Sequence, residues 1–288
     1  MDNLLILTII LGGLAASALN IGKGVQKLKV HVLLQGFGVF SEEHRRDFGI
    51  WLFGVLISLA SAALYSVSMK VSDKPSTVSS LVGVGLIALV IFARFVLKEK
   101  VGIRKLIGTA LIIIGTTVLT VFDSNAEAPE SFMPPKLLKF VGLMLAIYLA
   151  LIPYTLLTKR IHGFVFGSLA GFFIGLGLFI ADIALVESGG DLVEQFKNPY
   201  PYIAFISAIG AFSVTQLAFL RGRAIVVVPC INSFAILVPL YLEFFIYSIR
   251  LNNVQYSAVI TVVIGVVILS ATASGRVGMI NDDKNLKV

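Results

Sequence analysis

Residues 161–177 read IHGFVFGSLAGFFIGLG, with glycine at every fourth position of an otherwise apolar stretch. Apart from proline, glycine is the poorest helix former, yet this spacing aligns Gly163, Gly167, Gly171 and Gly175 along one side of a helix. Small residues let helix backbones approach closely in lipid, where little hydrophobic force draws helices together. The stretch therefore predicts a membrane helix that packs through its glycines, with Phe172 facing lipid.

The rest of the chain has the composition of an all-α integral membrane protein. Of its 288 residues, 57% are hydrophobic and only 14% are charged. A bilayer core of about 30 Å takes roughly 20 apolar helical residues to cross, and nine runs qualify as spans. They are Leu4–Leu19, Ile50–Met69, Val78–Leu97, Leu106–Phe122, Phe140–Leu157, Gly163–Ala181, Tyr202–Leu220, Ala224–Leu242 and Tyr256–Ala273.

The first run could also be a signal peptide, because AASALN at its end contains a small-x-small cleavage pattern. Asp2 stands where a signal peptide has basic residues, so we expect this helix to be retained.

The distribution of charge predicts the orientation of these helices. Most of the 23 lysines and arginines lie in or beside the segments that follow the first, third, fifth, seventh and ninth runs. Because basic loops stay in the cytoplasm, we expect a multi-pass protein of the cell membrane with its N-terminus outside and its C-terminus cytoplasmic. The net charge of +7 then reflects membrane topology, and no nucleic-acid partner is expected.

The two halves of the chain resemble each other. LIIIGTTVL (111–119) aligns with TVVIGVVIL (261–269), LISLASA (56–62) with FISAIGA (205–211), and GGLA (12–15) with GSLA (167–170), all at offsets near 150. An odd number of crossings separates the halves, so the repeats are inverted. The predicted organisation is a four-helix repeat (1–122), a linking helix (123–160), a second four-helix repeat (161–275) and a cytoplasmic tail (276–288).

The helix that opens each repeat carries a small-residue stripe. In the first helix, Gly12 and Ala16 stand at the same four-residue spacing as the glycines of the sixth. Inverted repeats with such faces let one half of many transporters move against the other. We therefore expect the two stripes to form contacts between the halves.

Four motifs carry a resemblance to known proteins. They are ALNIGKGVQKLKV (18–30), RRDFGIWLFGVLIS (45–58), the hairpin STVSSLVGVGLIALVIFARFVLKEKVGIRKLIGTALIIIGTTVL (76–119) and GAFSVTQLAFLRGRAIVVVPCINSF (210–234). With its 4 + 1 + 4 arrangement, the chain resembles the drug/metabolite transporter (DMT) superfamily of EamA-like proteins, and within it most of all the NIPA-type magnesium transporters.

The resemblance implies alternating-access transport of a small solute, either a divalent cation such as magnesium or an organic metabolite or drug. The sequence also leaves two alternatives open: that the protein forms a homodimer, and that it is a membrane scaffold without transport activity. Two departures matter. Ser79 and Ser80 replace a proline of the NIPA-type pattern, and the first helix lacks the carboxylate that small multidrug resistance proteins use for proton coupling.

Polar residues inside the predicted spans are candidates for the substrate pathway, because such groups are costly against lipid and commonly face a cavity or a partner helix. The amides are stronger candidates than the serines, which often serve only as contacts between helices. The candidates are Asn20, Ser61, Tyr65, Ser80, Gln216, Asn232 and Glu243.

Two acids are expected near the outer edge of the membrane. Asp182 and Glu243 each lie 19 residues from the cytoplasmic start of their runs, roughly 28 Å along a helix. They are predicted either to meet water at the interface or to form an outer vestibule that attracts cations. No metal-ligand set is identified, and the three histidines match no catalytic motif, so neither enzyme activity nor a cofactor is expected.

Overall fold

The computed structural model describes residues 3–71, 78, 81–122, 134–158, 161–189 and 191–273, and all regular structure in these ranges is helical. A 3-10 segment, η1 (Val30–Phe40), joins the first two of ten α-helices. The helices are α1 (Asn3–Lys29), α2 (Glu42–Val71), α4 (Val82–Phe95), α5 (Ile103–Val121), α6 (Pro134–Thr158), α7 (His162–Glu187), α8 (Leu192–Lys197), α9 (Tyr200–Arg221), α10 (Ala224–Tyr247) and α11 (Asn253–Ala273).

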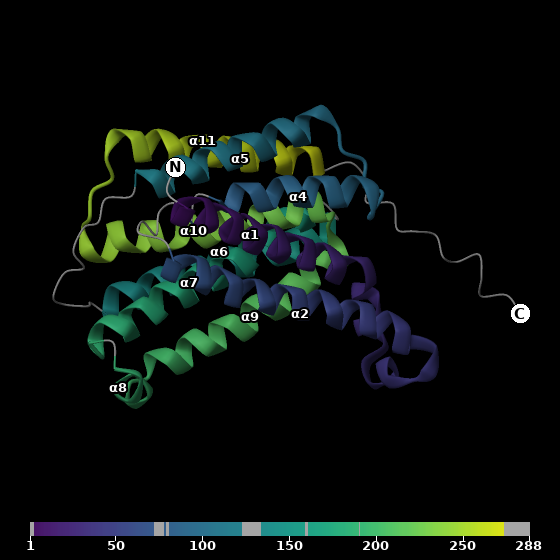
Figure 1. The fold of residues 1–288 in the computed structure, drawn as a ribbon, viewed down its shortest axis with the longest axis horizontal. Helices are drawn as coiled ribbons and strands as arrows, with labels where there is room; N and C mark the ends of the chain where they lie inside the picture. The colour runs from purple at the N-terminus through teal and green to yellow at the C-terminus, as the bar shows by residue number, and fades with distance from the viewer. Residues whose placement is uncertain are drawn as a thin grey trace, which may run out of the picture.

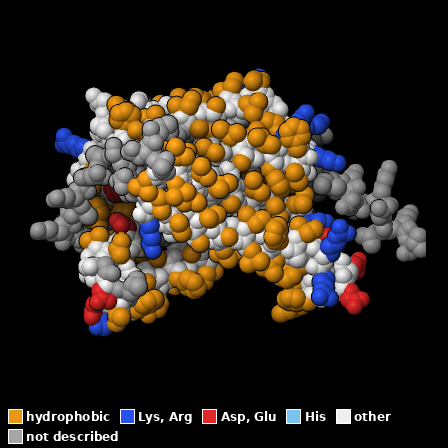
Figure 2. Space-filling view, in the orientation of Figure 1, with side chains coloured by type: hydrophobic (Ala, Val, Ile, Leu, Met, Phe, Trp, Pro, Cys, Tyr) orange, Lys and Arg blue, Asp and Glu red, His pale blue; other side chains and the backbone are white. Residues whose placement is uncertain are grey.

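The long helices lie side by side in one bundle (Figure 1). Eight helices among the described residues are long and apolar enough to cross a membrane, which indicates a multi-pass membrane protein. Among the described residues of the run expected at 78–97, the continuous helix is α4, with 14 residues. On the face shown in Figure 2, hydrophobic side chains cover the middle of the bundle and charged side chains gather toward its two ends.

Helix α1 is longer than its apolar run. It continues past Leu19 to Lys29, so Lys23 and Lys27 belong to the helix rather than to the cytoplasmic segment expected after the first run. Both lysines contact acceptors on other helices, which allows the helix to carry them. The chain turns within η1 at Gly36, whose φ of 54° favours glycine, and α2 begins at Glu42.

The glycine stripe of α7 packs against α10. A Cβ atom on Gly171 would lie 2.5 Å from the carbonyl oxygen of Ile231 and 2.7 Å from the Cβ of Phe234. Gly163, Gly167 and Gly175 face α10 in the same way along its length. The contact is thus as close as the small-residue spacing indicates, but α10 belongs to the same half of the chain.

The stripe of α1 is arranged similarly against α4. Gly12 lies beside Leu81, and Gly85 of α4 lies against the backbone of Ala16 and the side chain of Asn20. The expectation that the two stripes form contacts between the halves is therefore wrong. Each stripe packs on a helix of its own half, because Gly85 of α4 admits the α1 backbone and the glycines of α7 admit the backbone and larger side chains of α10, such as Ile231 and Phe234.

Phe172 does not face lipid, contrary to the expectation from the stripe. Its side chain is only 1% exposed and packs among the rings of Phe140, Tyr148 and Phe173. Helix α7 is covered on several sides, so no simple division into a glycine side and a lipid side describes it.

Helices α5 and α11 form a further glycine-mediated contact and run antiparallel. A Cβ on Gly108 would lie 2.9 Å from the carbonyl oxygen of Gly265, and a Cβ on Gly115 would lie 2.9 Å from the carbonyl oxygen of Ala258. Because these helices come from different halves, this pair joins the two parts of the chain.

Candidate functional site

A buried polar cluster lies where α1, α2, α9 and α10 meet. Three predicted pathway residues, Asn20, Gln216 and Asn232, come together in it, and Lys23 and Gln26 complete its centre. All five residues are at least nine-tenths buried. Because a buried polar group without a hydrogen bond costs several kcal/mol, the arrangement depends on how these groups satisfy one another.

The first branch of the cluster joins α1 to α10. Lys23 Nζ donates to Asn232 Oδ1 at 3.0 Å, and Asn232 Nδ2 donates to Asn20 Oδ1 at 3.1 Å. Asn20 Nδ2 in turn donates to the carbonyl oxygen of Ala16 at 2.9 Å. These bonds orient both asparagine amides, and in the described part of the chain Lys23 has one acceptor, Asn232 Oδ1.

The second branch joins α2, α9 and α1. Trp51 Nε1 donates to Gln216 Oε1 at 3.0 Å, and Gln216 Nε2 donates to Gln26 Oε1 at 2.8 Å. Gln26 Nε2 then donates to Ser58 Oγ at 3.0 Å and to the carbonyl oxygen of Gly54 at 3.3 Å. Both glutamine oxygens and both glutamine nitrogens are thus bonded, which holds the three helices in register.

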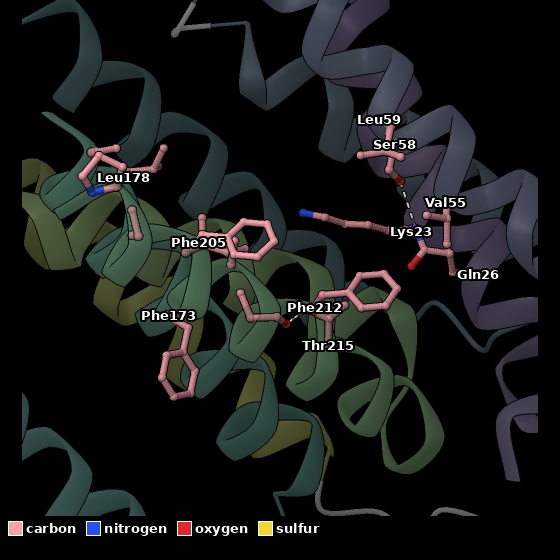
Figure 3. A pocket seen from close by; sticks show the side chains of 17 residues that line it. Lys23, Gln26, Val55, Ser58, Leu59, Phe173, Leu178, Phe205, Phe212 and Thr215 are labelled. Atoms are coloured by element: carbon pink, nitrogen blue, oxygen red, sulfur yellow. Dashed lines mark hydrogen bonds between the residues drawn. The ribbon is translucent and has the colours of Figure 1, made fainter. Parts of the chain in front are cut away.

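A cavity of about 590 Å³ lies beside this cluster. Its walls are mostly apolar and come from α2 on one side and from α7 and α9 on the other. The Lys23 side chain extends from α1 into the space between Val55, Ser58 and Leu59 on α2 and Phe173, Leu178 and Phe205 from the opposite wall (Figure 3). The cavity is therefore an apolar chamber with a cationic, hydrogen-bonding end.

Further contacts close the bundle on the side of the cluster away from the cavity. Lys27 Nζ donates to the backbone oxygen of Phe219. The Glu99 carboxylate, between α4 and α5, accepts hydrogen bonds from the backbone nitrogens of Ala224 at 2.7 Å and Ile225 at 3.1 Å. A carboxylate at the N-terminus of α10 also complements the helix dipole there. These contacts join the two halves where the cavity ends.

Ser61 and Tyr65 do not line the cavity. Ser61 is buried but donates to the carbonyl oxygen of Ser58 in its own helix, at 2.6 Å. Tyr65, farther along α2, is half-buried and is not among the residues that line the cavity. Ser80 lies outside the described residues.

The two outer acids also lie away from the cluster. Asp182 is exposed on α7, whereas Glu243 lines a separate cavity of about 210 Å³ with residues of α5 and α10. Glu243 stands eleven residues beyond Asn232, roughly 16 Å along α10. In the described part of the chain, no three His, Cys, Asp or Glu residues are placed to hold a metal ion.

Sequence reasoning missed Lys23, Gln26 and Trp51 as parts of the site. Lys23 and Gln26 lie in the motif of residues 18–30 and Trp51 in that of residues 45–58, but none of the three was predicted as a pathway residue. A signal was present, because Asn20, Lys23 and Lys27 recur at i, i+3 and i+7, the spacing of one helix face.

No family model, curated protein or solved structure matches the chain. The resemblance of its motifs to DMT proteins therefore stays a prediction, and a functional proposal rests on the geometry of the cavity and the cluster.

Proposed function

We propose that the chain is a membrane transporter of the DMT type that moves a small organic solute by alternating access through the 590 Å³ cavity. The observation that carries the proposal is the place of this cavity, between α1 and α2 of the first predicted repeat and α7 and α9 of the second. Transporters built from inverted repeats bind their substrates at the repeat interface.

The contacts among the helices support the inverted repeat. Helix α1 packs against α2 and α4, and α7 packs against α9 and α10. The offset of 150 residues relates Gly108 to Ala258 and Gly115 to Gly265. It therefore exchanges the Gly108–Gly265 contact with the Gly115–Ala258 contact, as a two-fold relation between the halves requires.

An organic solute suits the cavity better than magnesium does. Magnesium is bound through carboxylates while it keeps several waters, but the described residues that line this cavity include no Asp or Glu. The Lys23 ammonium at its end would repel a divalent cation. A scaffold protein, the further alternative, would need no such chamber between its halves.

Uptake into proteoliposomes tests the proposal. Purified wild-type protein is expected to move organic solutes faster than protein-free liposomes do, and to move magnesium no faster. Magnesium uptake well above the protein-free rate, without organic uptake, would favour the cation transporter. Uptake of neither would favour the scaffold.

The Glu243→Gln substitution distinguishes transport of a cation from transport of an organic solute. Glu243 lies roughly 16 Å along α10 from Asn232, so we expect the variant to change organic uptake by less than about twofold. If magnesium were the substrate, loss of this charge would weaken its apparent affinity, most of all at low ionic strength, where the field of a charge is screened least. Uptake titrations at two salt concentrations measure the difference.

The proposed topology places the C-terminus in the cytoplasm. We expect a reporter that is active only in the cytoplasm to work when fused after residue 288, and one that is active only outside to work near residue 125. Both sites lie outside the described residues, so the expectation comes from the positive-inside rule. Silence of both reporters would contradict the nine-helix topology.

A further inference from the structure

We infer that Lys23 is the anion-binding group of the cavity and that the ligand is an organic monoanion, a carboxylate on an apolar or aromatic body. The inference rests on the proposed function, because it assigns the substrate class of the same cavity. Lys23 is buried, with only 9% of its surface exposed.

Among the described residues, the Lys23 ammonium has no acidic partner of the kind that a buried charge requires. Ammonium groups have three donor hydrogens, and Asn232 Oδ1 is the acceptor that Lys23 finds within the protein. Neither ion pair in the described ranges, Lys29–Asp47 or Lys197–Glu194, involves it. Because buried charges are normally paired, a ligand carboxylate that accepts the remaining hydrogens would complete the site.

The walls of the cavity indicate the rest of the ligand. Phe173, Phe205 and Phe212 line the chamber, and the end of the Lys23 side chain points toward the wall that carries Phe205 (Figure 3). Pockets of this volume enclose a small organic molecule and bind it mainly through apolar contact. Lys23 is the only cation among the lining residues, so it balances one negative charge, and a doubly charged phosphate would keep an uncompensated charge.

Such a ligand could come from water or from the bilayer. Helices α2 and α9 flank the cavity, but in the described structure their backbones do not pack against each other. The Trp51 side chain bridges them instead, through its bond to Gln216 and its contact with the Phe212 ring. A water-soluble arylalkanoate and a fatty acid share the chemistry that Lys23 recognises, and the test includes both.

Trp51 provides the measurement because it is the single tryptophan of the chain and its ring centroid lies 6.1 Å from that of Phe212, a lining residue. Brominated ligands quench tryptophan fluorescence at short range. We therefore propose to titrate purified protein with 3-(4-bromophenyl)propionate and with its neutral amide. A second titration, in lipid nanodiscs, uses a brominated long-chain fatty acid and its methyl ester.

The wild-type protein is expected to bind the acid at least about tenfold more tightly than its neutral counterpart in one of the two titrations, the effect of one charge-assisted hydrogen bond. Lys23→Met should remove this preference, and Lys23→Arg should keep most of it. Lys29→Met is the matched control, because it deletes the same charge from the same helix at a residue that does not line the cavity. It should keep the preference.

Equal wild-type affinity for acid and neutral forms in both titrations would overturn the inference, and so would failure to bind any of the four probes. The comparison of probes on wild type needs no variant, so it decides the matter even if Lys23→Met fails to fold. Proteoliposome uptake separates the two proposals. Uptake of a neutral organic solute by a protein without acid preference would uphold the proposed function and reject the role of Lys23.

Discussion

Leucine in place of Gly171 is expected to leave almost no folded protein in the membrane. The first side-chain atom alone would lie 2.5 Å from the Ile231 carbonyl oxygen, and that backbone cannot move aside without separating α7 from α10. Overpacking commonly costs 1–3 kcal/mol, and a clash with helix backbone along the most buried contact of α7 should exceed about 3 kcal/mol. The yield of monodisperse protein after detergent extraction measures the effect.

Gly142→Leu is the matched control for this prediction. Gly142 lies in α6, also a long apolar helix, and no atom lies within 4 Å of the position where its Cβ would be built. Leucine there should give at least half the wild-type yield, and exchange of glycine for leucine should even favour the helix slightly. Similar yields for the two variants would show that the close packing of α7 on α10 is unimportant for folding.

The membrane spans could be predicted from the sequence because a membrane helix depends on local properties, the length and hydropathy of a single apolar run. Helix α10 begins at Ala224, the residue at which its apolar run begins. The end of α1 could not be found in this way. Its last turns carry Lys23 and Lys27, whose partners, Asn232 and Phe219, lie about two hundred residues away in the chain.

The packing partners could be predicted only in part. Four-residue spacing of small residues indicates a close helix contact, but any helix with a suitable surface can make it. Gly171 faces α10, a neighbour two spans later, and Phe172 is buried because α6 also covers α7. Both facts depend on the three-dimensional arrangement of several helices, which hydropathy does not record.

The residues of the candidate site could likewise be predicted only in part. Asn20, Gln216 and Asn232 could be singled out because an amide inside an apolar run needs a partner, and the structure brings all three together. The charge that gives the cavity its chemistry was missed, because a lysine after an apolar run is normally counted with the loop. Long basic side chains near the end of a helix also tend to extend toward the interface, which Lys23 does not do.

The largest effect within the cluster is expected from Asn232→Leu. The substitution removes the acceptor of the Lys23 ammonium and the donor to Asn20 Oδ1 while it keeps the branching of the side chain at Cγ. Removing one partner of a buried charge costs about 3–5 kcal/mol, because the other group is left uncompensated. The thermal midpoint in detergent should fall by roughly 10 °C, and transport should be lost.

The double substitution Lys23→Met with Asn232→Leu tests the cause of that loss. It removes the charge together with its acceptor, and replacing both partners of a buried polar pair by apolar groups is often nearly neutral. We therefore expect the double variant to recover most of the thermal stability that Asn232→Leu loses, with a coupling energy of about 2 kcal/mol or more between the two positions.

Stability should return without function in the double variant. The Lys23→Met change leaves no charge there to attract an anion, so the acid preference seen by Trp51 quenching should stay absent although the fold is restored. Ser233, which is buried beside Asn232 but bonds only to its own helix, supplies the control: Ser233→Ala should leave both stability and acid preference near wild type. If the losses of stability in the double variant are strictly additive, Asn232 stabilises the bundle independently of Lys23. The unpaired ammonium would then not be the cause of the instability of Asn232→Leu.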